Sequence, residues 1–389
     1  MKKKMLYRCS NCGFESIKWL GKCPTCNSWN TLQEEIVDIK KNVSAKINSG
    51  SQIRKLNDII SSKEDRIITG INEFDRVMGG GIVKDSITII TARPGAGKST
   101  LLLEISNEVA KKGLKVVYAS GEESDTQIKN RADRILNNIN ENIWVMQENS
   151  LDNVLQSIED INPDLIIVDS IQTFTMENSL PARAGSPTQT MECANTLLQV
   201  AKNEKRPRAV IIVGQMTKND ELAGLRALEH LVDTVLIIED DNEENLRVLV
   251  SSKNRFGGIE NGFFEMSDKG ILSIDNPSEF FMTKREENEV ISGCALSVIK
   301  EGTRSIITEV ESLVSKSFTP YPTRIGETLG KDKLNTLISI LEQRGGINLY
   351  DKNVIIYDIK SESRNLDCCI YATRQVMRPT IRSEEHTSE

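Results

Sequence analysis

The stretch ARPGAGKST, residues 92–100, has the residue types and spacing of a loop that binds phosphate groups. The apolar run DSITIIT leads into it, and the helix-like LLLEISNEVAKKG follows it. A strand, a glycine-rich turn and a helix in this order point backbone N–H groups and a helix N-terminus at a polyphosphate. Lys98 would then reach the β- and γ-phosphates, Ser99 would ligate Mg²⁺, and Thr100 would support the α-phosphate. The predicted nucleotide-binding residues are Ala92, Arg93, Pro94, Gly95, Ala96, Gly97, Lys98, Ser99 and Thr100.

One position departs from the usual pattern G-x-x-x-x-G-K-[ST], because Ala92 stands where the first glycine is expected. That glycine mainly ends the strand, and alanine adds a single methyl group, so an ordinary backbone conformation tolerates the exchange. Gly95 and Gly97 keep the freedom that the turn needs. We therefore expect the loop to hold a nucleotide.

Acidic residues follow two further apolar runs. PDLIIVDS ends in Asp169 at the expected carboxyl tip of a strand, where a carboxylate can hold the water shell of Mg²⁺. VVYASGEES ends in Glu122 and Glu123, and one of these carboxylates could polarise an attacking water. Capping of the next helix is the alternative role for this glutamate pair.

The segment CSNCGFESIKWLGKCPTC has the C-x2-C-x10-C-x2-C spacing of a four-thiolate zinc site. So short a segment cannot bury much of a core, so the metal would supply its folding energy. Phe14, Trp19 and Trp29 are expected to pack around the metal. The other four cysteines have no such spacing and are interpreted as buried or incidental thiols. The predicted zinc ligands are Cys9, Cys12, Cys23 and Cys26.

The composition is that of a chain with two or three domains: 389 residues, of which 38% are hydrophobic. No apolar run approaches the length of a membrane span, and no apolar segment follows the basic N-terminus, so we expect a cytoplasmic protein with no membrane partner. Residues 1–60 carry eleven Lys and Arg against five Asp and Glu, although the whole chain has a net charge of −7. A basic arm suits nucleic acid, and a solvated lysine-rich terminus is the alternative.

Strand and helix patterns alternate after a polar linker. Several strands are nearly continuous apolar runs, which predicts an α/β fold whose parallel sheet is covered on both faces. The candidate strands are KVVYAS, DLIIVDS, RAVIIVGQ, DTVLIIED and LRVLVSSK. We divide the chain into a zinc finger (1–35), a linker (36–65), an ATPase-like domain (66–280), an α+β domain (285–381) and a tail (382–389).

Motifs in a fixed order give the chain a resemblance to the bacterial RadA/Sms DNA-repair family over essentially its whole length. After the zinc motif these are TGINEFDRVMGGGIV, GAGKSTLLLE, SGEES, VGQMTK, LEHLVDTVL and KNRFGGIENGFFEM. The resemblance implies a RecA-like P-loop ATPase core, an N-terminal four-cysteine zinc finger and a C-terminal domain shaped like the Lon protease. It also implies ATP, Mg²⁺ and Zn²⁺ as cofactors.

The resemblance assigns roles to further residues. Lys98, Ser99 and Asp169 match the two Walker motifs, and Glu122 matches the glutamate that positions water. Gln215 stands where the family has histidine and can still sense a γ-phosphate through a hydrogen bond. In KNRFG, residues 253–257, strand alternation sends Lys253 and Arg255 to one face, where they would act on a neighbouring subunit's nucleotide; DNA binding or simple solvation is the alternative. The residues expected to meet DNA are Arg183, Lys218 and Arg226.

The resemblance also implies partners and an activity: a homohexameric, DNA-dependent ATPase that works on single-stranded and branched DNA, promotes branch migration, and acts with the RecA recombinase. Two other functions stay open, namely a signalling or clock-type ATPase acting on a protein, and a scaffold that uses nucleotide only to assemble.

The C-terminal segment departs from a working protease. Proteolysis in a Lon-like domain needs a Ser–Lys dyad, and Asn365 in SESRNLDCC stands at the serine position, so no protease activity is expected. The final RSEEHTSE resembles the translation of a sequencing adapter. We interpret it as an assembly artefact and expect the Lon-like domain to be truncated.

Overall fold

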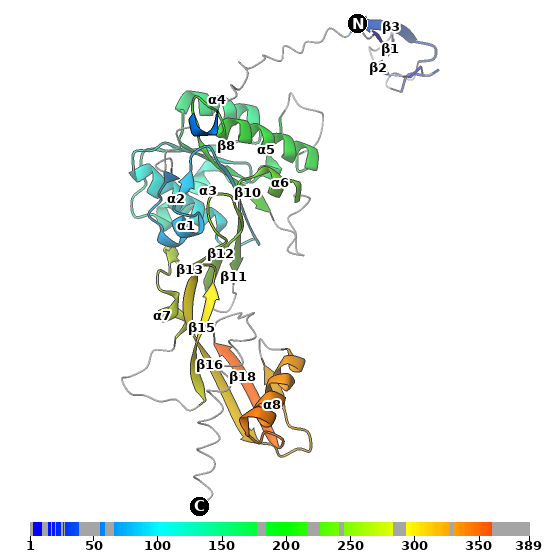
Figure 1. Cartoon of the computed structure of the whole chain (residues 1–389). Coiled ribbons are helices and arrows are strands. Elements are labelled where there is room, and N and C mark those ends of the chain that lie inside the picture. Colours follow the sequence, from blue (N-terminus) through cyan, green and yellow to red (C-terminus); the bar gives the residue numbers. More distant parts are fainter. Residues whose placement is uncertain are drawn as a thin grey trace, which may run out of the picture. The chain divides into compact units, whose positions relative to one another are not determined.

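The structure is a computed structural model of the chain. It describes residues 3–9, 15–16, 18–19, 21–24, 26, 28–38, 55–58, 66–176, 184–215, 226–240, 245–282, 293–326 and 330–359. Two compact units are present, Met1–Ser62 and Lys63–Glu389. Figure 1 labels their elements. No helix of the described residues is long and apolar enough to cross a membrane.

The first unit is built on a three-stranded antiparallel sheet in the order β2-β1-β3. The central strand β1 (Lys3–Cys9) pairs with β2 (Glu15–Ser16) and along its whole length with β3 (Leu32–Asp38). A single 3₁₀ turn, η1 (Leu56–Asp58), follows later in this unit. The described core of this sheet is small and centres on two buried cysteines, which fits a unit whose stability comes from a metal.

A nine-stranded sheet forms the centre of the second unit, in the order β14-β13-β12-β11-β6-β10-β9-β7-β8. Neighbouring strands from β11 to β8 run parallel, and the pairs from β11 to β14 are antiparallel. The strands are β6 (Ile87–Ala92), β7 (Val116–Ser120), β8 (Ile143–Gln147), β9 (Leu165–Asp169), β10 (Ala209–Gln215), β11 (Thr234–Asp240), β12 (Leu246–Asn254), β13 (Asn261–Ser267) and β14 (Gly270–Ser273).

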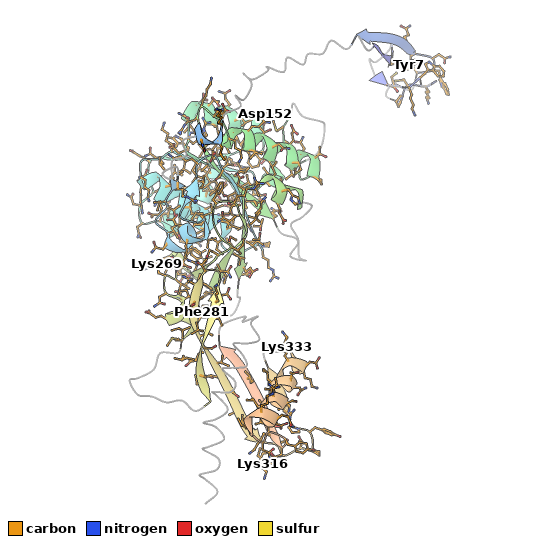
Figure 2. All side chains as sticks on the ribbon, viewed as in Figure 1. Tyr7, Asp152, Lys269, Phe281, Lys316 and Lys333 are labelled. Atoms are coloured by element: carbon orange, nitrogen blue, oxygen red, sulfur yellow. The ribbon has the colours of Figure 1, made fainter. Side chains whose placement is uncertain are left out.

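Helices cover both faces of this sheet, as the continuous apolar strands predict. Leu102, Ile105 and Ile128 pack on one face, and Val154 and Leu197 pack on the other. Figure 2 shows side chains filling the space on both sides. The helices of the first face are α2 (Lys98–Lys111) and α3 (Asp125–Ile135); those of the second are α4 (Leu151–Ile161), α5 (Pro187–Ala201) and α6 (Arg226–Leu231). The expected α/β core is confirmed.

Short elements lead into this core and out of it. The two-stranded ladder β4 (Arg66–Ile67) and β5 (Ile82–Val83) encloses α1 (Asn72–Val77), and η2 (Ile171–Thr173) follows β9. The helix α7 (Pro277–Phe281) follows β14.

The C-terminal part is a four-stranded sheet in the order β15-β16-β18-β17, with one helix packed on it. Leu334 and Ile338 of the helix pack against Val310, Val314 and Val354 of the sheet. These elements are β15 (Cys294–Glu301), β16 (Arg304–Lys316), β17 (Arg324–Gly326), α8 (Lys331–Gly345) and β18 (Lys352–Ile359). Asn365 and the tail 382–389 lie outside the described residues.

Candidate functional site

Four adjacent parallel strands bring their carboxyl ends to one edge of the large sheet. β10 lies between β6 and β9, and β7 follows β9, so the ends of all four strands are neighbours. The register aligns Gln215 with Ala92 and Asp169 with Ser120. Open α/β sheets bind ligands at this edge, beyond the carboxyl ends of the strands.

The glycine-rich turn has the backbone that a phosphate loop needs. Gly95 and Gly97 have φ of +86° and +96°, and α2 begins at Lys98 directly after them. The positive φ of Gly97 favours glycine at this position, and a Cβ atom there would also lie 2.3 Å from the methyl carbon of Met266. Ala92 is the last residue of β6 and is fully buried in ordinary strand conformation, which meets the condition for tolerating alanine.

The ammonium group of Lys98 lies over this turn. Its Nζ donates to the carbonyl oxygens of Ala92, at 2.9 Å, and Arg93, at 3.2 Å. Burial lowers the pKa of Lys98, while the carboxylates of Asp169 and Glu122 act to raise it. The Lys98 ammonium group therefore lies between the glycine-rich turn and the carboxylates of Asp169 and Glu122. A bound polyphosphate would take the place of the two carbonyl oxygens that it now contacts.

Asp169 and Ser99 form the candidate magnesium site. The hydroxyl of Ser99 donates to Asp169 Oδ2 at 3.1 Å, and the Tyr118 hydroxyl donates to the same oxygen at 2.7 Å. Burial raises the pKa of Asp169, and these two hydrogen bonds act to lower it. Mg²⁺ takes oxygen ligands, and a hydroxyl and a carboxylate supply them here, so the residues fit this ion.

Tyr118 belongs to the candidate site, although the sequence did not reveal it. It lies inside the apolar run of β7 and looks like a core residue there, and it is buried with 1% exposure. Its pairing with Asp169 depends on the register between β7 and β9, which places Tyr118 two residues from the strand end. Burial, followed by the charge of Asp169, raises the pKa of Tyr118 well above its usual value, so the hydroxyl stays a donor.

The two glutamates after β7 have different partners. Glu122 Oε1 accepts hydrogen bonds from the Ser170 hydroxyl and from Gln215 Nε2, the latter at 2.7 Å. Glu123 instead forms a two-pronged ion pair with Arg131 of α3, at 2.5 and 2.7 Å. The geometry therefore brings Glu122 to the candidate site and ties Glu123 to a helix.

The residue after the glutamate pair, and not the pair itself, caps the next helix. Ser124 caps α3: its Oγ accepts from the backbone N–H of Gln127, and the Gln127 side chain accepts from the Ser124 N–H. This is a complete capping box.

The KNRFG residues lie at the opposite edge of the sheet, where the parallel strands begin. Asn254 pairs with Thr234, which pairs with Thr88 near the start of β6, whereas the phosphate loop follows Ala92 at its end. Four residues of strand separate the two edges, about 13 Å. Arg255 is thus placed away from the nucleotide residues of its own subunit.

Both cationic side chains of this motif reach the segment 229–233. Lys253 Nζ donates to the carbonyl oxygens of Glu229, in the last turn of α6, and of Val232, directly after that helix. Arg255 donates to Asp233 at 2.9 Å and remains 53% exposed. Burial, and then the charge of Arg255, lowers the pKa of Lys253. Arg255 is the more available of the two cations.

The residues expected to meet DNA are mostly not described. Arg183 and Lys218 lie outside the described residues, and Arg226 is the first residue of α6 with its side chain also outside them.

Three of the four predicted zinc ligands converge in the first unit. The sulfur atoms of Cys9, Cys23 and Cys26 lie within 4.8 Å of one another, with Cys9 and Cys26 at 3.6 Å. Thiolates 2.3 Å from a tetrahedral Zn²⁺ lie about 3.8 Å apart, so the cluster has the size of a zinc site. Cys12 lies outside the described residues.

The aromatic packing expected around the zinc site is wrong for two of its three residues. Trp19 is 56% exposed and Trp29 is 71% exposed, and Lys22 lies over the Trp29 ring. Phe14 lies outside the described residues. Tyr7 of β1 packs against the two buried cysteines instead.

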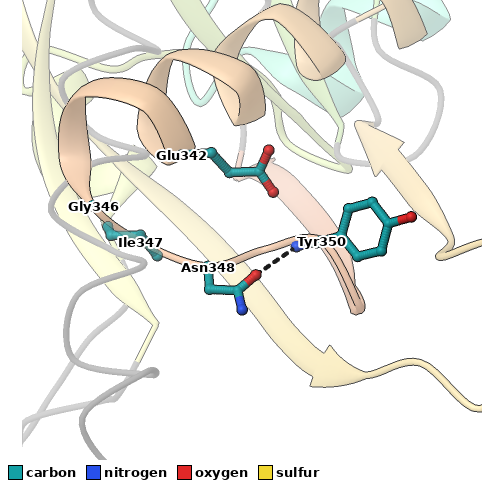
Figure 3. A pocket seen from close by; sticks show the side chains of 5 residues that line it. All are labelled: Glu342, Gly346, Ile347, Asn348 and Tyr350. Carbon is teal, nitrogen blue, oxygen red and sulfur yellow. Dashed lines mark hydrogen bonds between the residues drawn. The ribbon is translucent and has the colours of Figure 1, made fainter.

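A hollow beside the C-terminal end of α8 is separate from this chemistry. Figure 3 shows the turn that forms it, where Asn348 Oδ1 accepts from the Tyr350 N–H at 3.1 Å. Because α8 packs on the four-stranded sheet, the hollow is no part of the nucleotide site. Its lining residues are Glu342, Gly346, Ile347, Asn348 and Tyr350.

Known proteins match the chain over nearly its full length. DNA repair protein RadA of Bacillus subtilis is 37% identical over 361 residues, which covers 91% of this chain and 78% of the relative. RadA of Listeria monocytogenes is 39% identical, and RadA of Campylobacter jejuni is 40% identical, each over 91% of this chain and 77% or 78% of the relative. The chain belongs to the RadA family of DNA repair proteins.

Two models of protein families match separate parts of the chain. A rubredoxin metal binding domain matches residues 7–34, and an AAA domain matches residues 54–221. The zinc ribbon and the P-loop ATPase core predicted from the sequence are thereby confirmed, with Zn²⁺, ATP and Mg²⁺ as their cofactors. A KaiC-like protein from Pyrococcus horikoshii OT3 is also similar, at a TM-score of 0.44 and 20% identity over 54% of this chain and 98% of its own.

Proposed function

We propose that this RadA-family ATPase is a DNA-dependent motor in recombinational repair, which binds single-stranded DNA as a homohexamer and promotes branch migration. The observation that carries the proposal is the joining of Glu122 to Gln215 beside the Ser99–Asp169 pair. The catalytic carboxylate is thereby tied to the end of β10, from which the chain continues into residues 216–225. That segment holds Lys218, which is expected to meet DNA.

In the proposed reaction, water attacks the γ-phosphate and releases ADP and inorganic phosphate. Mg²⁺, when bound, neutralises charge on the phosphate oxygens. Lys98 holds the β- and γ-phosphates, Ser99 and Asp169 hold the ion, and Glu122 orients and polarises the water. Ser170 and Gln215 donate hydrogen bonds that fix the Glu122 carboxylate.

Gln215 would transmit the state of the DNA segment to the reaction. Its side chain is exposed at the strand tip, and its Nε2 donates to the Glu122 carboxylate. A shift of the chain beyond Gln215 on DNA binding would therefore move the donor that positions Glu122. A displacement of 1 Å in a catalytic group can cost about 100-fold in rate, so a small shift suffices to switch hydrolysis.

Assembly into a ring would give Arg255 its role. It lies at the sheet edge away from its own phosphate loop, and it is the more exposed cation of the KNRFG motif. Supplied to a neighbour's γ-phosphate, such an arginine is worth roughly 10³–10⁵ in rate where it has been measured. The proposal takes the work of this ring on DNA to be cytoplasmic, with the RecA recombinase as partner and with ATP hydrolysis as the only catalysis.

The proposal is tested by ATP turnover of the full chain with no DNA, single-stranded DNA and duplex DNA, followed by strand transfer on a three-stranded branch. We expect single strands to stimulate turnover most and ATP to be required for branch movement. Lys98→Ala should abolish both, whereas Lys111→Ala, at the exposed end of the same helix, should change neither. ATP turnover that DNA does not change would contradict a DNA-dependent motor and favour an ATPase acting on a protein. No turnover at all would favour a scaffold.

The role of Arg255 is tested by mixing subunits. Lys98→Ala and Arg255→Ala should each be inactive alone. A mixed ring contains interfaces with an intact Lys98 on one side and an intact Arg255 on the other, so part of the DNA-stimulated turnover should return. No recovery in rings shown to contain both subunits would place Arg255 outside the neighbour's site.

A further inference from the structure

Four charged side chains form a cluster where the β15–β16 hairpin meets the ATPase core. Arg304, at the start of β16, makes a two-pronged pair with Glu73 of α1, with both nitrogen–oxygen distances at 2.9 Å. Glu73 also binds Arg76, and Arg76 binds Glu260 at 2.6 Å. Glu260 in turn accepts from the backbone N–H of Thr303, at 3.1 Å. We name Glu73, Arg76, Glu260 and Arg304 the four-charge cluster.

The cluster is closed and largely buried. The chain of contacts starts at Arg304 and returns to Thr303, the adjacent residue, so the hairpin tip holds both ends of it. Glu73 is 2% exposed and Glu260 is 6% exposed. Two carboxylates and two guanidinium groups balance in charge, and each buried carboxylate has a cation, as burial of charge requires.

The hairpin tip fits this site closely. Glu301 pairs with Arg304 across a two-residue turn, and Gly302 in that turn has a φ of +62°. A Cβ atom at Gly302 would lie 2.5 Å from Glu260 Oε2. The Arg304 guanidinium also lies 5.1 Å from the centre of the Phe263 ring, a cation–π contact. The tip therefore holds the core through side chains and through close backbone approach.

Glu260 connects the cluster to the KNRFG motif. Its N–H donates to Ser251 Oγ at 2.9 Å, and the Ser251 N–H donates to its carbonyl oxygen at 3.0 Å. These two bonds close the base of the segment 252–259, which runs from the last residues of β12 into the following loop and contains residues 253–257. Glu260 thus lies at the junction between the hairpin tip and the loop that carries Arg255.

The helix α1 makes a second connection to the same loop. Glu73 lies near its start, and at its end the carbonyl oxygen of Val77 accepts from Asn254 Nδ2 at 3.1 Å. In the turn that follows, a Cβ atom at Gly79 would lie 3.1 Å from the Gly257 Cα, so the two backbones are in close contact. Movement of the hairpin tip would therefore reach the loop by two routes.

We propose that the β15–β16 hairpin positions the KNRFG loop through the four-charge cluster, so that the C-terminal part controls hydrolysis at a neighbouring subunit. This inference rests on the proposed function, in which Arg255 acts on the neighbour's nucleotide. Glu73, Arg304 and Glu260 are positioning residues, because they act on Arg255 through other parts of the chain: Glu73 lies on α1, Arg304 pairs with Glu73, and Glu260 closes the base of the segment that carries Arg255.

The test uses Arg304→Met, which removes the charge and keeps most of the side-chain volume. A displacement of about 1 Å in Arg255 should lower the kcat for ATP about 10- to 100-fold, with little change in KM, because the subunit's own phosphate loop is intact. Glu73→Gln, which keeps the hydrogen-bonding shape, should act in the same direction and serves if Arg304→Met folds poorly. Arg324→Met, a partly buried arginine of the same C-terminal part but outside the cluster, should leave turnover unchanged.

Mixing identifies the step that fails. Arg304→Met subunits should regain turnover when mixed with Lys98→Ala subunits, which supply an intact Arg255, and should gain nothing from Arg255→Ala subunits. Hydrogen exchange should also quicken at the Ser251 and Glu260 amides while β9 stays protected. A merely structural role of Arg304 would lower turnover without this pattern of rescue.

Two results separate the inference from the function on which it rests. If Lys98→Ala and Arg255→Ala subunits fail to complement each other, the role of Arg255 is wrong and this inference falls with it. If they complement, and Arg304→Met and Glu73→Gln turn over ATP at the wild-type rate, the coupling alone is wrong.

Discussion

Glu104→Gln should stabilise the ATPase core at alkaline pH and do so much less at pH 5. Glu104 lies on α2, and its carboxylate accepts from the Ile271 N–H at 2.8 Å. Burial raises its pKa from the usual 4.5 to about 7. The folded state therefore holds this proton more tightly than the unfolded state. The resulting stability is fully present below pH 4.5 and is lost as the pH rises to 7.

The size of this effect follows from the two pKa values. The step from 4.5 to about 7 corresponds to roughly 3 kcal/mol without screening. Because the side chain is only partly buried, water screening leaves about 1–2 kcal/mol. Glutamine keeps the acceptor for Ile271 and has no charge to bury. For a core of this size the melting temperature at pH 8 should rise by about 2–8 °C.

The assay is calorimetry at pH 5 and pH 8, following the transition that ATP shifts upward, since ligand binding marks the unfolding of the ATPase core. Glu204→Gln is the control, an exposed glutamate just after α5. It should show no gain at pH 8 relative to pH 5. Equal melting shifts for Glu104→Gln at both pH values would refute the reasoning.

Three further predictions concern the metal ions and the loop. Tyr118→Phe should raise the Mg²⁺ concentration for half-maximal turnover roughly tenfold, because a hydrogen bond to a carboxylate contributes about 1.5 kcal/mol or more; an unchanged magnesium titration would contradict this. Ala92→Gly should change ATP affinity by less than about 1 kcal/mol, measured by nucleotide titration, since only flexibility at the strand end differs. Chelation or Cys23→Ser should unfold residues 1–35, seen as loss of amide protection, while the ATPase core keeps its melting temperature; zinc bound stoichiometrically after loss of Cys23 would count against the site.

Local patterns made the phosphate loop and the core strands predictable. The runs before Ala92 and around Asp169 are apolar because both faces of their strands are buried, and this property is visible in a single stretch of sequence. The residue type in the turn before β6 also follows from local backbone conformation. Asp85 has a φ of +64°, and aspartate adopts this conformation more readily than most residues, which explains why it can stand in this turn.

Contacts between distant strands were not predictable in the same way. The sequence shows Gln215 at a strand end, but its bond to Glu122 depends on β10 lying between β6 and β9. The four-charge cluster joins residues more than 200 positions apart, and no spacing rule relates Glu73 to Arg304. The predicted domain boundaries and the roles of the site residues remain predictions.

The most direct test of the account is the rate of ATP hydrolysis by Glu122→Gln, with and without single-stranded DNA. We predict that the variant binds ATP as tightly as the wild type and that its DNA-stimulated turnover falls about 10²–10⁴-fold, because the positioned carboxylate no longer polarises water. Glu123→Gln, which loses only its pairing with Arg131, should keep most of the turnover. Wild-type turnover by Glu122→Gln would contradict the account, as would a wild-type rate that single-stranded DNA leaves unchanged.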